Sequence, residues 1–162
     1  VSSLYDYVTG VEVGIGSNGR KNRGGHQMEA LVEEHLKNAC VEYYKEMYLT
    51  EIENKWNIDL SAVSAKGTST KRWDFVVKTK SKIFVIETNF YASSGSKLNE
   101  TARSYKMIAE EAKEIPNFEF VWITDGAGWT DAKRNLEETF IVLENLYNIT
   151  DMENGIFNRI FE

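Results

Sequence analysis

Two short runs of β-branched and aromatic residues, separated by a polar turn, constrain the fold of this chain most strongly. The runs cover residues 72–78 and 82–89, and together they predict a β-hairpin. With the turn centred between residues 80 and 81, the register places Asp74 directly opposite Glu87, with Cα atoms about 5 Å apart. The hairpin therefore predicts two carboxylates that face each other across neighbouring strands.

A facing pair of carboxylates in a sheet calls for a compensating charge. Like charges directly opposite each other destabilise a ladder. Glu87 also ends the apolar run 83–86, which is typical of a buried strand, where an unpaired carboxylate costs several kcal/mol. Mg²⁺ prefers oxygen ligands and uses one or two carboxylates, so the pair predicts a magnesium site. Pairing of each carboxylate with Arg or Lys, or an exposed position at the end of the sheet, remains the alternative.

The rest of the chain alternates helical and extended patterns. Apolar residues recur with a helical period over residues 26–48 and 96–115, with Ser96 as a candidate N-cap. The segment 51–64 is ambiguous, with a strand indicated at 58–63, and 118–124 is a continuous apolar strand. A helix follows Thr130 with Leu136, Phe140, Leu143 and Leu146 inward, and the tail from Ile156 forms a short helix. This order predicts an α/β fold with a central mixed sheet flanked by helices.

Length and composition are those of one globular domain. The 162 residues contain a single cysteine, Cys40, which favours a reducing, cytoplasmic compartment, and no apolar run is long enough to span a membrane. We divide the chain into a basic, glycine-rich lead-in at 1–25 and a domain at 26–162. The net charge is −6, but residues 137–162 carry six acids and one base, so the remainder is nearly neutral and contains local basic clusters.

Several stretches resemble a known family. Asp74 and the Glu87-Thr88-Asn89 run, on adjacent strands after a helix, resemble the PD-(D/E)xK nuclease superfamily, whose core has the order αβββαβ. The longer stretches are similar to the DpnII/MboI family of type II restriction endonucleases, and they read GRKNRGGH at 19–26, FVIETNFY at 84–91, SGSKLNETARSY at 94–105 and VWITDG at 121–126. Family enzymes are longer at the N-terminus, so we expect this chain, which starts at Val1, to be a C-terminal, catalytic part.

The resemblance implies an activity and a set of metal ligands. It implies Mg²⁺-dependent cleavage of double-stranded DNA at GATC, blocked by adenine methylation and performed by a homodimer. Asp74 and Glu87 would hold the metal, with the Thr88 carbonyl as a third ligand. A helical Glu such as Glu29 often completes the site in the superfamily, although the helix N-terminus alone also stabilises a carboxylate there.

One position departs from the superfamily pattern, which usually has a lysine where Asn89 stands. An Asn side chain cannot act as a base and carries no charge, so it can only orient a water through hydrogen bonds. Lys97, in the first turn of the helix after the hairpin, is the nearest candidate to replace that lysine. Lys78, four residues after Asp74, is the second. A simple phosphate contact or a solvated helix start explains Lys97 equally well.

Basic residues elsewhere indicate where DNA would bind. Phosphate contacts are expected from Arg20, Lys21, Arg23, Lys97 and Arg103. The run 14–19 formally matches G-x-G-x-x-G, but residues 20–25 separate it from the next helix and the acidic strand end expected about 20 residues further on is missing, so no nucleotide cofactor is expected. Three rival functions stay open: a repair or junction nuclease on the same fold, a DNA-binding domain that has lost catalysis, and an interaction domain with an acidic tail.

Overall fold

The fold is described from a computed structural model, which covers residues 25–63, 71–93, 95–130, 132 and 140–162. The lead-in expected at 1–25 lies almost wholly outside the described residues. In chain order the described elements are α3 (Gly25–Asn38), β1 (Glu42–Tyr48), α4 (Leu49–Trp56), the 3-10 turn η1 (Ser61–Val63), β2 (Arg72–Lys78), β3 (Ile83–Phe90), α5 (Ser96–Ala112), β4 (Phe118–Asp125), β5 (Leu146–Tyr147), α7 (Ile149–Glu153) and α8 (Ile156–Ile160).

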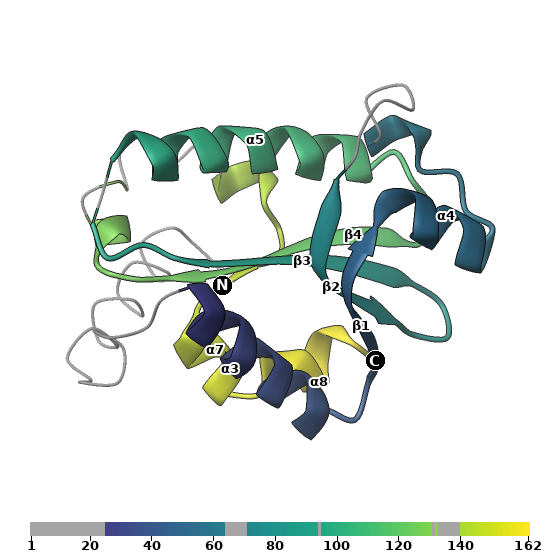
Figure 1. The fold of residues 1–162 in the computed structure, drawn as a ribbon, viewed down its shortest axis with the longest axis horizontal. Coiled ribbons are helices and arrows are strands. Elements are labelled where there is room, and N and C mark those ends of the chain that lie inside the picture. The colour runs from purple at the N-terminus through teal and green to yellow at the C-terminus, as the bar shows by residue number, and fades with distance from the viewer. Residues whose placement is uncertain (1–24, 64–70, 94, 131, 133–139) are drawn as a thin grey trace.

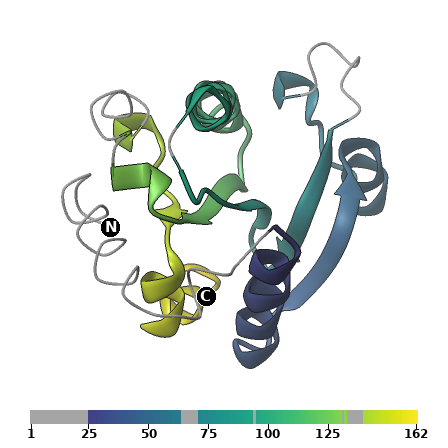
Figure 2. The ribbon, with the colours of Figure 1, turned by 60° about the vertical axis from the view of Figure 1, so that its left-hand side comes forward.

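Five strands form one mixed sheet in the order β1-β2-β3-β4-β5. The pairs β1–β2 and β2–β3 are antiparallel, whereas β3–β4 and β4–β5 are parallel. Helix α5 connects β3 to β4 and covers one face, while α3, α7 and α8 cover the other (Figure 1). Figure 2 shows α5 nearly end-on, with α3 and the short C-terminal helices on the opposite side of the sheet. The expected α/β fold with a flanked mixed sheet is confirmed.

The hairpin register predicted from the sequence is confirmed. Lys78 pairs with Ile83 and Phe75 with Ile86, as a turn centred between residues 80 and 81 requires. The ladder of backbone pairs ends at Phe75 and Ile86, one position before Asp74 and Glu87 would pair. The two carboxylates therefore lie where the strands begin to separate.

The helix predicted over residues 26–48 is wrong in its second half. Helix α3 ends at Asn38, and Cys40 adopts a left-handed φ of 56°, which turns the chain into strand β1. The apolar residues of 41–48 fit a helical period, but their backbone pairs with β2. The strand predicted at 58–63 is also wrong, because residues 58–60 form no regular element and residues 61–63 form the 3-10 turn η1. β1 thus supplies the first of the three strands in the order αβββαβ.

Three smaller predictions are corrected or confirmed. Ser96 is the first residue of α5 and not its cap, since Gly95 stands at the N-cap without a side-chain bond. Leu146 lies in the short strand β5 and not in a helix. The tail helix is confirmed as α8. Of the helix predicted after Thr130, residues 132 and 140–142 are helical, and most of the remainder lies outside the described residues.

The sheet separates two apolar clusters. On the α5 side, Trp73, Trp122 and Trp129 are buried, and the Trp122 ring meets the Tyr105 ring edge-on at a centroid distance of 4.8 Å. On the other side, α3 packs Met28, Val32 and Leu36 against β2, β3 and β4. Among the described residues, no helix has the length and apolar character needed to cross a membrane. Both faces of the central strands are thus buried, which leaves the ends of the sheet for polar chemistry.

Candidate functional site

Asp74 and Glu87 meet at the end of the β2–β3 ladder. Here the Asp74 side chain, and not a backbone group, bonds to β3: its Oδ2 atom accepts a hydrogen bond of 2.9 Å from the Thr88 N–H. The Thr88 hydroxyl lies 3.4 Å from the same oxygen. This bond holds the Asp74 carboxylate against β3. The two carboxylates predicted from the sequence therefore lie together at the point where the strands begin to separate.

The Glu87 carboxylate is buried and strongly perturbed. Glu87 is only 4% exposed. Burial and then the neighbouring Asp74 charge raise the pKa of Glu87 from its ordinary value to about 8, against the opposing effect of the Lys71 ammonium. A carboxylate held in this way favours either a proton or a cation beside it.

Glu87 gives the metal-free protein a characteristic dependence of stability on pH. Because the folded-state pKa is about 8 and the ordinary value is 4.5, the folded state binds more protons between these limits. We expect the free energy of unfolding in EDTA to fall as the pH rises from about 5 to about 8. The Glu87→Gln variant should lose most of this slope in urea titrations at several pH values. Equal slopes for the two proteins would contradict the assignment.

Lys71 is the residue that sequence reasoning missed. Its Nζ atom forms an ion pair with Oε1 of Glu87, and it lies 5.1 Å from the ring centroid of Trp73 and 5.7 Å from that of Tyr105. In the sequence Lys71 is merely a basic residue beside Arg72, with which β2 begins. Two signals together could have identified Lys71. A buried carboxylate needs a cation, and Lys71 lies at the open end of the hairpin that carries Glu87.

Asn89 is held by a neighbouring indole. Its Oδ1 atom accepts a 2.8 Å hydrogen bond from Nε1 of Trp122 on β4. The side-chain oxygen is therefore engaged in the core, and the amide group is the part that can donate to a water or phosphate. This arrangement is compatible with the predicted role in orienting a water.

The remaining predicted residues lie at different distances from the pair. Glu29 on α3 is half-buried, and its pKa is raised by burial and then by the Asp74 charge, which places it near the site. Lys97 is exposed in the first turn of α5, and Arg103 is exposed further along the same helix. Lys78 lies at the turn end of β2, about 13 Å along the strand from Asp74, where it bonds the Thr79 carbonyl.

The cluster predicted to touch DNA before α3 falls outside the described residues. It consists of Arg20, Lys21 and Arg23. Their roles stay predictions.

The donor set suits a small, hard cation. Asp74 and Glu87 offer carboxylate oxygens, and burial and then the Asp74 charge raise the pKa of Glu87. Within the described ranges, no three His, Cys, Asp or Glu side chains form a metal-binding group. Two carboxylates completed by a backbone carbonyl, water and phosphate are the set that Mg²⁺ uses. The ligand roles of Thr88 and Glu29 stay predictions.

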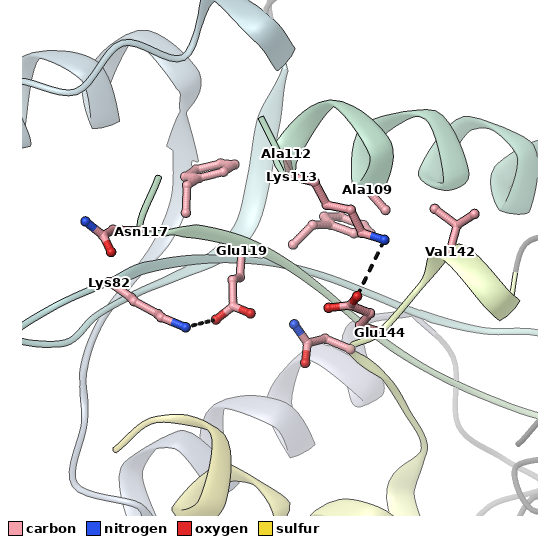
Figure 3. Close-up of a pocket in the computed structure, with 11 residues that line it drawn as sticks. Lys82, Ala109, Ala112, Lys113, Asn117, Glu119, Val142 and Glu144 are labelled. Atoms are coloured by element: carbon pink, nitrogen blue, oxygen red, sulfur yellow. Dashed lines mark hydrogen bonds and ion pairs between the residues drawn. The ribbon is translucent and has the colours of Figure 1, made fainter. Parts of the chain in front are cut away.

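A hollow of about 210 Å³ lies beside the start of β4, between the end of α5 and residues 142–145 (Figure 3). Ion pairs cross it, with Lys82 at 3.1 Å from Glu119 and Lys113 at 3.5 Å from Glu144. Since these charges neutralise one another, the hollow offers neither a cation nor an anion site.

The sheet topology and the carboxylate pair define a class of protein: an α/β fold with a restriction-endonuclease-like core. The family model described as DpnII restriction endonuclease matches residues 1–159, and the chain belongs to this family. No solved structure matched the chain.

Three relatives show the extent of the similarity. The chain is 55% identical to the type II restriction enzyme DpnII of Streptococcus pneumoniae, over 99% of this chain and 57% of the relative. It is 44% identical to the type II restriction enzyme MboI of Moraxella bovis, over 96% and 53%. It is 37% identical to the type II restriction enzyme MjaIII of Methanocaldococcus jannaschii, over 99% and 57%. The chain thus spans about half the length of these curated relatives.

Proposed function

We propose that this protein is a type II restriction endonuclease that hydrolyses DNA phosphodiester bonds at unmethylated GATC sites with the help of Mg²⁺. The observation that carries the proposal is the meeting of the Asp74 and Glu87 carboxylates at the end of the β2–β3 ladder. The three relatives are all type II restriction enzymes, which supports the activity class. GATC as the target rests on the resemblance of the sequence stretches described above.

Each residue of the site has a task in this reaction. When bound, Mg²⁺ would polarise a phosphate and lower the pKa of a water beside it. Asp74 and Glu87 would hold the metal, and the Thr88 N–H fixes the direction of the Asp74 carboxylate. The Asn89 amide donates to the attacking water from a position that the Trp122 indole fixes. The protein therefore contributes a preorganised set of oxygens and donors at the edge of an otherwise apolar sheet.

A palindromic target implies a symmetric enzyme. A twofold dimer matches the twofold symmetry of a GATC duplex, because each subunit then meets the same half-site. We therefore include a homodimer in the proposal. Analytical ultracentrifugation of the chain with and without a GATC duplex tests it, and a one-to-one complex of protein and duplex would contradict it.

The test is a plasmid digest with the full chain. We expect discrete fragments from unmethylated plasmid in Mg²⁺, none in EDTA, and none from adenine-methylated plasmid. Glu87→Ala should abolish the fragments, whereas Glu119→Ala, which removes a carboxylate from the far end of the neighbouring strand, should leave them unchanged.

Other outcomes point to the rival functions. A smear without discrete sizes, or cutting only at branched DNA, would indicate a repair or junction nuclease. Binding to DNA without cleavage would indicate an inactive DNA-binding domain, and repeating the digest with a chain extended at the N-terminus then distinguishes a dead site from an incomplete protein.

A further inference from the structure

The proposed reaction needs a positive side chain near the carboxylates. A phosphodiester brings one negative charge to a site that already holds Asp74 and Glu87, with Glu29 close by. These three carboxylates and one divalent cation leave a net negative charge, which would repel the phosphate. Asn89 cannot correct the balance, because an amide is neutral and its oxygen is engaged by Trp122.

Lys71 is held where that charge is needed. Its ammonium forms an ion pair with Oε1 of Glu87, and the Glu87 side chain is only 6% exposed whereas that of Lys71 is 29% exposed. The lysine thus connects the buried carboxylate with the surface that a DNA strand could reach. Three N–H donors allow the ammonium to bond Glu87 and a phosphate oxygen at the same time.

The position of Lys71 is fixed from both ends. Its backbone carbonyl accepts a 3.0 Å hydrogen bond from the Leu49 N–H at the start of α4. Its ammonium lies over the faces of the Trp73 and Tyr105 rings, in the range of cation–π attraction. Tyr105 is itself beside the pair, since burial and then the Glu87 and Asp74 charges raise its pKa. A charged group held by two rings and a carboxylate is preorganised rather than solvated.

The other lysines considered for this task are placed less well. Lys97 is exposed at the start of α5, and Lys78 points to the turn end of the hairpin. Among the described residues, the lysine that forms an ion pair with Glu87 is Lys71.

Resting on the proposed nuclease function, we propose that Lys71 is a catalytic residue of this site, whose ammonium contacts a non-bridging oxygen of the scissile phosphate while Glu87 holds it in place. It provides the positive charge that Asn89 lacks, and it stabilises the additional negative charge that develops on the phosphorus oxygens.

The first measurement is the cleavage rate of a GATC duplex by full-chain variants. Lys71→Met keeps an unbranched stem against the rings but removes the charge, and we expect the rate to fall by about 100-fold or more. Lys71→Arg should recover part of the loss. Lys55→Met is the matched control, because Lys55 also lies over two rings, those of Tyr44 and Trp56, at 5.0 and 5.7 Å. A rate within about threefold of the unmodified protein for Lys71→Met would overturn the proposal.

The second measurement reports phosphate contact without catalysis. The affinity for the duplex is followed against salt in Ca²⁺, comparing the unmodified chain with Lys71→Met and with Lys71→Arg, which keeps the charge. Loss of one phosphate contact in each subunit of the proposed dimer should reduce the slope of log K against log salt by about 1.8. An unchanged slope would overturn the contact even if cleavage is lost, since Lys71 would then act only through Glu87.

The two proposals fail in distinguishable ways. If neither the unmodified chain nor the chain extended at the N-terminus cuts the DNA that it binds, the nuclease function fails, while the salt slope still decides whether Lys71 contacts phosphate. If the unmodified chain cuts and Lys71→Met cuts equally well, the role of Lys71 alone fails. Absence of any DNA binding by the unmodified chain contradicts both.

Discussion

Replacement of Asp74 by Asn is expected to lower the cleavage rate by about 10³-fold without unfolding the protein. The Asn oxygen can still accept the 2.9 Å hydrogen bond from the Thr88 N–H, so the end of the β2–β3 ladder should keep its shape. The negative charge is lost, and with it one of the two carboxylates that would hold the metal. The rate is measured on a GATC duplex, and the melting temperature in EDTA is measured beside it.

Asp59→Asn is the matched control for this substitution. Asp59 is exposed, and its Oδ1 atom also accepts a 2.9 Å bond from a backbone N–H, that of Ser61. Its variant should therefore cleave at the unmodified rate. Since Asp74 raises the pKa of Glu87, its neutralisation should leave the melting temperature in EDTA unchanged or higher. A fast Asp74→Asn enzyme would show that the reaction does not depend on this carboxylate pair.

Gly126→Ala is expected to reduce the free energy of unfolding by at least about 3 kcal/mol. Gly126 has a φ of +120°, which side chains rarely adopt, and a Cβ there would lie 2.0 Å from the Tyr91 carbonyl oxygen. The obstacle is backbone and cannot rotate away. Because Tyr91 directly follows the strand that carries Glu87, the collision would displace the end of β3 as well as destabilise the fold.

Gly95→Ala provides the comparison. Among the described residues other than its chain neighbours, no atom lies within 4 Å of a Cβ at Gly95, and its φ of 164° is an ordinary extended value. The free energy of unfolding of Gly95→Ala in urea titrations should therefore lie within about 1 kcal/mol of that of the unmodified protein, since only the N-cap preference for Gly over Ala is lost. Similar losses for both substitutions would show that the close approach of Gly126 to Tyr91 does not limit stability.

Much of the fold could be predicted from local pattern. The hairpin, its register and strand β4 follow from runs of β-branched and aromatic residues, because alternation and turn position determine which residues face each other. The Asp74 and Glu87 pair follows from that register alone. The apolar residues of the tail likewise predict helix α8.

The boundary between α3 and β1 could not be predicted in this way. The apolar residues of 41–48 satisfy a helical period as well as a strand, so periodicity alone does not choose between them. The left-handed turn at Cys40 and the pairing with β2 choose the strand. Long-range hydrogen bonds to a strand about 30 residues away therefore override the local preference.

By itself, the sequence determined the sheet hairpin and the two carboxylates that face each other on it, because both depend on residues close together in the chain. Only the tertiary structure decided how those carboxylates are compensated. The Lys71 ammonium meets Glu87 because β2 runs antiparallel to β3, and it is held there because α5 brings Tyr105 over the same end of the sheet. Groups from three separate elements hold this cation. Its position therefore depends on how these elements pack and not on the spacing of residues along the chain, so no sequence pattern indicates it.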